Sequence, residues 1–314
     1  MEVKDIKKIF VVGAGTMGSG LAQVYAQAGY NVALYSRTQQ TLDKATELTK
    51  SSLQTMAQES LLDSKKIPAI LDRIKTTTFL EEGAKDADIA VETVVDNIET
   101  KKEIFKQLDK LCPTRTIIAS NTSFLNIFEF ADTSRPDKVL IAHWYMPPQL
   151  VPFIDVVKGP QTSDASLQLV VDMLRKMGKK TAVMQKFIPG YMINRLQMAL
   201  NREVYYLVDN DYMTPQEIDE AARWGLALRM LVLGLLQRMD YGGIDMTVKN
   251  LNNPNTKPVP IDYKPKKVLE LYKQGHLGVK TGKGWYDYSG KTQAEWNHER
   301  DVGLIKLLKA LKFK

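Results

Sequence analysis

The sequence predicts an α/β protein of two domains, in which a doubly wound parallel sheet is followed by an all-α domain. Two observations carry this prediction. Short β-rich runs alternate with helical runs from Lys7 to about Lys186, as they do in parallel sheets. After Ile188-Pro-Gly190 the alternation ceases, and apolar residues recur every three or four positions. We therefore expect a sheet domain over residues 1–187 and a helical domain over residues 188–314.

A glycine-rich turn follows the first predicted strand. Ile9 to Val12 is apolar without a helical period, which is typical of a buried strand, and the chain then reads G-x-G-x-x-G. In a Rossmann domain these glycines allow the tight turn, the approach of a pyrophosphate to the backbone, and the close packing of helix on strand. The N-terminus of the following helix then points at the anion. The residues predicted to bind a dinucleotide here are Gly13, Gly15, Thr16, Met17 and Gly18.

The end of the second strand bears on the choice of cofactor. NAD enzymes of this kind usually place Asp or Glu about 20 residues beyond the glycines, where the carboxylate binds the adenosine ribose. Here the strand Val32–Tyr35 leads into Ser36, Arg37 and Thr38. Two hydroxyls and a guanidinium suit a 2′-phosphate, so we predict NADP(H) in preference to NAD(H). In the alternative reading, Arg37 is a solvated residue at a helix start and the enzyme uses NAD.

The sheet domain should contain one long helical insertion between its second and third strands. This insertion, Gln39 to Asp72, is expected to form two helices in a hairpin that projects from the sheet. The predicted strands are Lys7–Val12, Val32–Tyr35, Ile74–Thr78, Ile89–Glu92, Thr116–Ser120, Val139–His143, Phe153–Val157 and Thr181–Met184.

Composition narrows the possible partners. The chain has 314 residues and a net charge of +7, which suits a phosphorylated small molecule as well as nucleic acid. Because no dense basic run interleaved with aromatic residues occurs, we expect no nucleic-acid partner. The longest apolar stretch, near Gly225 to Leu236, is broken by Arg229, so we expect no membrane association either. The single cysteine, Cys112, is typical of a reducing compartment, and we predict a cytoplasmic protein without a metal centre.

Three segments at the ends of neighbouring strands carry candidate catalytic residues. They are Ala119–Ser123, Ala142–Pro148 and Phe153–Val157, and open α/β sheets bind their ligands at the carboxyl ends of strands. A histidine and a carboxylate from adjacent strands can form a pair in which the carboxylate fixes the tautomer and stabilises the imidazolium. Taken singly, His143 would be a packing residue and Asp155 a solvated carboxylate. Because both residues follow a predicted nucleotide site, we predict that His143 is a general base and that Asp155 is its orienting partner.

With these motifs in place, the sequence resembles the L-3-hydroxyacyl-CoA dehydrogenases, a family that includes 3-hydroxybutyryl-CoA dehydrogenase. The resemblance covers nearly the whole chain and implies a Rossmann domain followed by an α-helical domain that carries much of a homodimer interface. The motifs that carry it are Val12–Gly18, Val91–Asn97 with Lys101–Phe105, Ser120–Ser123, His143 with Pro147, Pro189–Leu196 and Leu277–Tyr288. Pro189–Leu196 and Leu277–Tyr288 are the most specific for the family, because other Rossmann dehydrogenases share Val12–Gly18 but not these two.

The resemblance also implies roles for individual residues. His143 would be the general base that takes the 3-hydroxyl proton as hydride leaves C3, while Ser123 and Asn194 hold the substrate oxygen. A paired carboxylate would raise the pKa of His143 so that the imidazole works in both directions. The remaining family positions are Glu92, Lys101 and Asn121 for the cofactor, with Lys101 near the nicotinamide, and Ser52 in the hairpin for coenzyme A.

The sequence departs from the family pattern at four positions. Asp155 stands where the family has Glu, and its side chain is shorter by one methylene. Met146 stands where the family usually has Asn, and it cannot bond like an amide. Glu59 replaces a lysine of the hairpin and would repel a CoA phosphate, and Ser36 replaces the ribose-binding aspartate. These departures concern the substrate more than the class of reaction.

A second likeness leaves the substrate open. Asn194 to Leu200, followed by Gly225 to Arg229, resembles the branch that includes lambda-crystallin and the gulonate or carnitine dehydrogenases, whose substrates are free hydroxy compounds. There Arg229 would bind a substrate carboxylate, or else pair structurally with an acidic residue. The predicted function is an NAD(P)-dependent dehydrogenase of an L-3-hydroxyacyl-CoA. The alternatives are a dehydrogenase of a small non-CoA 3-hydroxy acid and a catalytically silent, crystallin-like nucleotide-binding protein.

Overall fold

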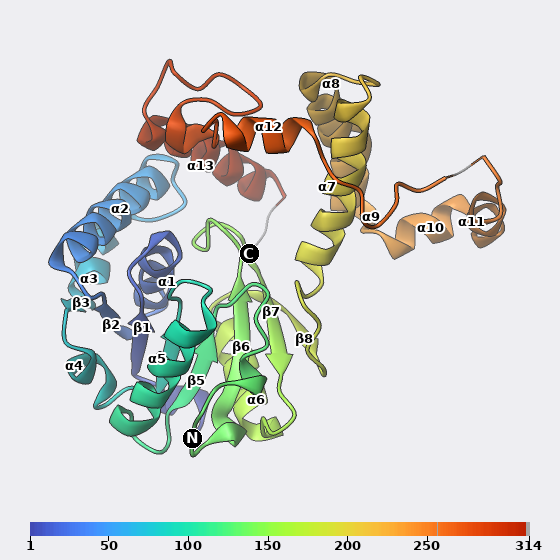
Figure 1. Cartoon of the computed structure of the whole chain (residues 1–314). Helices are drawn as coiled ribbons and strands as arrows, with labels where there is room; N and C mark the ends of the chain where they lie inside the picture. The colour runs from blue at the N-terminus through green and yellow to red at the C-terminus, as the bar shows by residue number, and fades with distance from the viewer. Residues whose placement is uncertain (256, 312–314) are drawn as a thin grey trace. The chain divides into compact units, whose positions relative to one another are not determined.

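The computed structural model describes residues 1–255 and 257–311 (Figure 1). These residues form two compact units. The first comprises Met1–Met192 together with the described residues from Asn297 onward, and the second comprises Ile193–Trp296. The first unit contains the sheet and the second is helical, which confirms the predicted sequence of an α/β domain and an all-α domain. The residues from Asn297 onward were predicted to belong to the helical domain, but they pack on the first unit.

One sheet runs through the first unit in the order β3-β2-β1-β4-β5-β6-β7-β8. Every predicted strand is present, and its ends lie within one residue of the prediction. All neighbouring strands are parallel except β6 and β7, because the loop 145–152 between them is shorter than the dozen or so residues of a parallel crossover. The strands are β1 (Lys8–Val12), β2 (Asn31–Tyr35), β3 (Ile74–Thr77), β4 (Ile89–Glu92), β5 (Ile117–Ser120), β6 (Val139–Trp144), β7 (Phe153–Lys158) and β8 (Lys180–Met184).

The central strands are buried on both faces. Along β1, Ile9 and Val11 belong to one hydrophobic cluster, whereas Phe10 and Val12 belong to another. Successive side chains of a strand point to opposite faces, so these two clusters lie on the two sides of the sheet. This arrangement explains why the run is continuously apolar instead of alternating.

Helices of the first unit cover the sheet and carry the long insertion. α2 and α3 form this insertion, but the hairpin does not stand free, because its buried residues Leu42, Ala45 and Leu53 join the cluster that contains α1 residues (Figure 1). The helices are α1 (Thr16–Gln27), α2 (Gln39–Gln58), α3 (Ile67–Asp72), α4 (Leu80–Ala84), α5 (Ile98–Leu111) and α6 (Asp164–Lys176). Short 3₁₀ turns lie at Val3–Asp5, Ser64–Lys66, Ile127–Glu129 and Pro136–Lys138.

The second unit is a helical array closed by a glycine-rich turn. Within the Leu277–Tyr288 motif, Gly278 and Gly282 have φ values of 86° and 74°, and the Tyr286 hydroxyl donates to Asp219 Oδ2 at 2.6 Å. The motif therefore ties itself to α8 as a structural turn. The elements are α7 (Ile193–Asp209), α8 (Pro215–Glu220), a π-helical stretch (Ala221–Ala227), α9 (Leu228–Leu233), α10 (Leu236–Gly242), α11 (Ile244–Leu251), α12 (Lys267–Lys273), a 3₁₀ turn (Val279–Thr281) and the start of α13 (Gln293–Ala310).

None of the helices in residues 1–255 and 257–311 has both the length and the apolar character needed to cross a membrane.

Candidate active site

The glycine turn after β1 is shaped by its own packing. Gly13 has a φ of 109°, and a Cβ there would meet the Thr93 carbonyl oxygen at 2.7 Å. A Cβ on Gly18 would meet the Gly13 oxygen at 1.7 Å, so helix α1 can lie on the turn only because Gly18 has no side chain. Around Gly15, by contrast, a Cβ would meet nothing within 4 Å. The backbone at Gly15 and the N-terminus of α1 at Thr16 therefore face open space, where a pyrophosphate fits.

The three residues that follow β2 lie at the surface. Thr38 is the N-cap of α2 and accepts a hydrogen bond from the Thr41 amide at 3.4 Å. Ser36 is partly exposed, and its amide donates to the Thr77 carbonyl at 3.3 Å. Arg37 is exposed, and no hydrogen bond or ion pair occupies its guanidinium within the described residues. Among these three, Arg37 has the charged side chain that is free to meet an anion.

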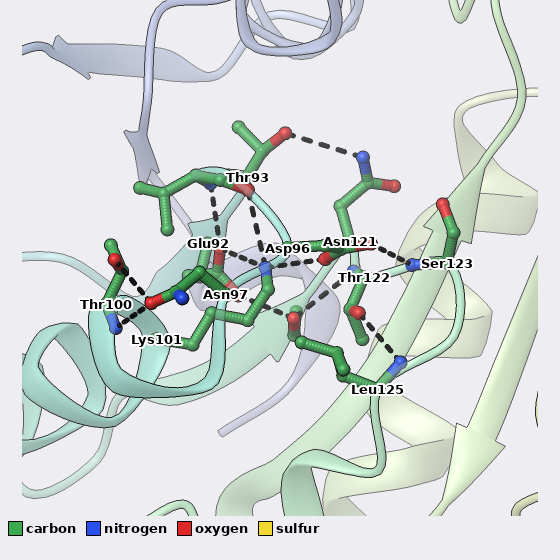
Figure 2. A network of polar contacts seen from close by, with 12 residues as sticks. Glu92, Thr93, Asp96, Asn97, Thr100, Lys101, Asn121, Thr122, Ser123 and Leu125 are labelled. Atoms are coloured by element: carbon green, nitrogen blue, oxygen red, sulfur yellow. Dashed lines mark hydrogen bonds and ion pairs between the residues drawn. The ribbon is translucent and has the colours of Figure 1, made fainter.

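A buried polar network joins the ends of β4 and β5 (Figure 2). Glu92 is fully buried and accepts three hydrogen bonds: from Lys101 Nζ at 2.7 Å, from Ser120 Oγ at 2.6 Å and from the Val94 amide at 2.8 Å. Lys101 is itself 0% exposed. Both predicted cofactor residues thus hold the loop after β4 in place, and a buried pair of this kind is costly to break.

Asp96, which is not among the residues predicted from the sequence, extends this network toward the catalytic candidates. Its carboxylate lies 3.2 Å from Lys101 Nζ and accepts the Ser123 amide at 3.2 Å (Figure 2). The Asp96 side chain is 38% exposed. Asp96 therefore fixes the backbone of Ser123 and places a negative charge near His143. Its place inside the quoted Val91–Asn97 motif was the signal available in the sequence.

Asn121 connects the neighbouring strand ends. Its amide donates to the Glu92 carbonyl at 2.8 Å, its Oδ1 accepts the Trp144 amide at 2.8 Å, and its side-chain nitrogen lies 3.4 Å from Thr93 Oγ1. This side chain thereby ties the loop after β5 to the end of β6, next to His143.

Ser123 and His143 meet directly. Ser123 Oγ lies 3.2 Å from His143 Nε2, and the imidazole is 4% exposed. Burial lowers the pKa of His143 from 6.5 to about 4, and the charge of Asp96 opposes this shift in part. At neutral pH the imidazole is therefore uncharged and able to accept a proton.

Asp155 faces His143 across the antiparallel pair of β6 and β7, where the two residues are in register. No hydrogen bond joins them: His143 Nδ1 and Asp155 Oδ1 are both buried without a partner among the described residues. Asp155 instead accepts a hydrogen bond from the Tyr145 hydroxyl, and burial raises its pKa. The expectation that a paired carboxylate raises the pKa of His143 is therefore wrong for this structure, because desolvation dominates.

Tyr191 completes the wall around the histidine and was also missed from the sequence. Its hydroxyl donates to the Thr122 carbonyl at 2.7 Å, and its ring centroid lies 4.9 Å from that of His143. Tyr191 is 0% exposed and has a φ of 51°. Its position in the Pro189–Leu196 motif marked it in the sequence, but its contact with His143 depends on the tertiary fold.

The other predicted substrate residues belong to other elements of the chain. Asn194 is at the start of α7 and Arg229 is on α9, both in the second unit. Arg229 Nε donates to the Gly225 carbonyl at 2.6 Å, and the residue is exposed. Ser52 is half-buried on α2, and Met146 is 59% exposed. Over the described chain, no group of three or more acidic, histidine or cysteine residues could hold a metal ion.

Sequence models of one family match both units of the chain. The model described as "3-hydroxyacyl-CoA dehydrogenase, NAD binding domain" matches residues 8–187, and that described as its C-terminal domain matches residues 190–288. A "Probable 3-hydroxybutyryl-CoA dehydrogenase" of Bacillus subtilis is 36% identical over 92% of this chain and 99% of its own length.

Two further similarities extend over more of the chain. A "5-formyl-3-hydroxy-2-methylpyridine 4-carboxylate 5-dehydrogenase" of Mesorhizobium japonicum is 28% identical and covers 98% of both sequences. A crystal structure described as that dehydrogenase, an NAD+-dependent dismutase, superposes with a TM-score of 0.86 at 27% identity and covers 98% of this chain and 99% of that chain.

Proposed function

This chain belongs to the 3-hydroxyacyl-CoA dehydrogenase family, and we propose on that premise that it transfers a hydride between a nicotinamide cofactor and C3 of an L-3-hydroxyacyl-CoA or 3-ketoacyl-CoA. As a member of this family it is an NAD-linked oxidoreductase. The observation that carries the assignment of the site is the contact between Ser123 Oγ and His143 Nε2, at the edge of the sheet where the dinucleotide turn also lies.

The residues around the glycine turn fit a dinucleotide. The N-terminus of α1 and the open space at Gly15 would receive the pyrophosphate, and the buried Glu92–Lys101 pair would support the loop beside it. When bound, the nicotinamide supplies or accepts the hydride. The protein's own residues hold the substrate oxygen and move its proton.

His143 is assigned as the group that moves this proton. In the oxidation direction its Nε2 accepts the 3-hydroxyl proton while Ser123 holds the same oxygen by a hydrogen bond. The resulting imidazolium is buried, so it needs a compensating charge. Asp155 is the assigned source, because its unpartnered Oδ1 and the unpartnered Nδ1 of His143 belong to residues that are in register. Asn194 would add a second contact to the substrate oxygen on the basis of the family pattern, and Ser52 would contact CoA.

Turnover measurements test this assignment. Initial rates of NADH and NADPH oxidation would be measured with acetoacetyl-CoA, beside free acetoacetate as the control without CoA. Turnover of the thioester is the expected outcome. Tight nucleotide binding without turnover of either compound would instead favour a catalytically silent protein.

We further propose that the residues after β2 accept NADP(H). The support is local: no carboxylate follows β2, and the exposed Arg37 guanidinium has no partner within the described residues. The matching family model is described as NAD binding, and the similar crystal structure is described as NAD+-dependent, so the preference for NADP(H) is tested separately. The double change Ser36→Asp with Arg37→Ala should shift the ratio of kcat/KM for NADPH over NADH toward NADH by about tenfold or more. Lys44→Ala, an exposed cation on α2, is the control, and a wild type that already prefers NADH would contradict the proposal.

A small hydroxy acid without CoA is the second candidate substrate. The observation that favours it is a relative named for a pyridine carboxylate, a free acid without CoA, which is 28% identical over 98% of the chain; the hydroxybutyryl-CoA relative is 36% identical over 92%. In this reading the exposed guanidinium of Arg229 would bind the free carboxylate of the substrate, a group that a CoA thioester lacks. Turnover of free acetoacetate in the assay above would support this candidate.

We also propose a homodimer formed through the helical unit. Large apolar side chains are exposed on α9 to α11, among them Val232 (78%), Leu236 (76%) and Leu251 (80%). Exposed apolar side chains that gather on one part of a protein often mark an interface. The cytoplasmic location stays a prediction, for which the buried single cysteine, Cys112, is the support.

A further inference from the structure

The C-terminal segment, residues 297–311, lies outside both family domains, because the matches to those domains end at residue 288. The segment continues helix α13 and belongs to the first unit. Within that unit it lies on helix α2 (Figure 1). Its contacts with α2 therefore come from residues that neither family match covers.

Three contacts hold the C-terminal segment against α2. The His298 ring nitrogen Nδ1 lies 3.0 Å from Thr55 Oγ1, and because this hydroxyl donates its proton to the Ser51 carbonyl, the imidazole is the donor. Lys309 Nζ donates to the Glu59 carbonyl at 2.7 Å. Ile305, 0% exposed, packs with Met56 and Leu150 in a separate hydrophobic cluster.

These contacts fall on the face of α2 that carries Ser52. Residues spaced by three or four lie on one side of a helix, so Ser52, Thr55, Met56 and Glu59 form a single stripe. Under the proposed function, Ser52 is the contact for CoA. The C-terminal segment therefore lies beside that position and contacts the other three residues of its stripe.

We propose that the C-terminal segment is a specificity element: bound to α2, it hinders the CoA moiety and favours substrates that lack the nucleotide. The inference rests on the proposed function, since it requires that the CoA moiety approach the Ser52 face of α2. A ligand that binds only when the segment has left α2 has an apparent dissociation constant equal to the intrinsic one divided by the fraction of molecules in that open state. The smaller this fraction is, the weaker the binding. The effect should therefore appear in KM for the CoA substrate and leave kcat nearly unchanged.

The test compares two substrates with the same reacting group. Acetoacetyl-CoA carries the nucleotide, whereas the acetoacetyl thioester of N-acetylcysteamine does not. In Ile305→Ala, loss of the buried side chain weakens the closed state, and kcat/KM for acetoacetyl-CoA should rise by about tenfold. The value for the short thioester should not change. Limited proteolysis within the segment should become faster in the same variant, because more molecules are open.

Two milder variants and one matched control keep the test decisive. His298→Ala and Lys309→Ala each remove one polar contact at the partly exposed surface, so they should raise kcat/KM for acetoacetyl-CoA even if Ile305→Ala unfolds. Lys306→Ala removes an exposed lysine on the same segment that bonds nothing on α2, and it should have no effect.

Each possible outcome has one meaning. An unchanged ratio of the two substrates in all three variants would overturn the proposal. A lower kcat/KM for acetoacetyl-CoA in Lys309→Ala would also overturn it, since the segment would then help to bind the CoA phosphates. Failure of the wild type and of every variant to turn over either thioester would count against the proposed function itself.

Discussion

The environment of His143 is formed mainly by residues that are distant from it in the sequence. Its Nε2 meets Ser123, its ring is enclosed by Tyr191 and Tyr145, and its Nδ1 has no partner within the described chain. The residue type and strand position identified it as a candidate base. The direction of its pKa shift could not be predicted, because desolvation depends on side chains that the fold brings from distant parts of the sequence.

The pH dependence of the oxidation reaction tests this environment. The free enzyme needs neutral His143, whose pKa is lowered to about 4, so kcat/KM should stay constant down to about pH 5 and fall below pH 4. A break between about pH 6 and pH 7 would contradict the dominance of burial and would indicate a formed His143–Asp155 pair.

The free energy of unfolding should also depend on pH through His143. Because the folded-state pKa lies below the unfolded value of 6.5, the unfolded chain binds the proton first as the pH falls. The contribution of neutral His143 to the free energy of unfolding is therefore present above pH 6.5 and is lost through the window down to about pH 4.

At the scale of elements, the strands could be predicted closely because each is a short apolar run bounded by turn residues. The antiparallel direction of β7 follows from the short loop before it, and this direction places Asp155 opposite His143. The position of the C-terminal segment could not be predicted, because its amphipathic pattern does not identify α2 as the surface that it covers. Asp96 was missed for a similar reason, since its contacts with Lys101 and Ser123 join separate elements.

The glycine turn gives a test at this scale, because its glycines have separate physical roles. Gly18→Ala should lower the free energy of unfolding by about 1–3 kcal/mol, since its Cβ would meet the Gly13 oxygen at 1.7 Å. Gly15→Ala should leave the melting temperature unchanged and weaken nucleotide binding by about tenfold, because only a ligand would occupy that space. Thermal unfolding and nucleotide titration measure the two effects. Equal destabilisation by both changes would show that Gly15 has a packing role.

At the scale of the whole molecule, the domain sequence and the family are established, whereas the assembly is a proposal. The helical unit exposes large apolar side chains on α9 to α11, and a second copy of the chain is the partner that the family pattern implies.

Light scattering tests this assembly. The wild type should have the mass of a dimer at micromolar concentration, and Val232→Asp with Leu236→Asp should reduce it to that of a monomer, because charges replace the exposed apolar surface. Leu48→Asp, a 50% exposed leucine on α2 of the first unit, is the control and should leave the mass unchanged. A monomeric wild type would contradict the proposed dimer.

The proposed function depends above all on His143 as the group that moves the substrate proton, and one variant removes that group. In His143→Ala, kcat for NAD(P)-linked turnover of acetoacetyl-CoA should fall by about 10²–10⁴-fold, while the dissociation constant of the cofactor stays nearly the same. His276→Ala, a histidine of the second unit, is the control and should retain activity. A His143→Ala variant that keeps wild-type turnover would contradict the assignment of the base, and with it the proposed role of Asp155.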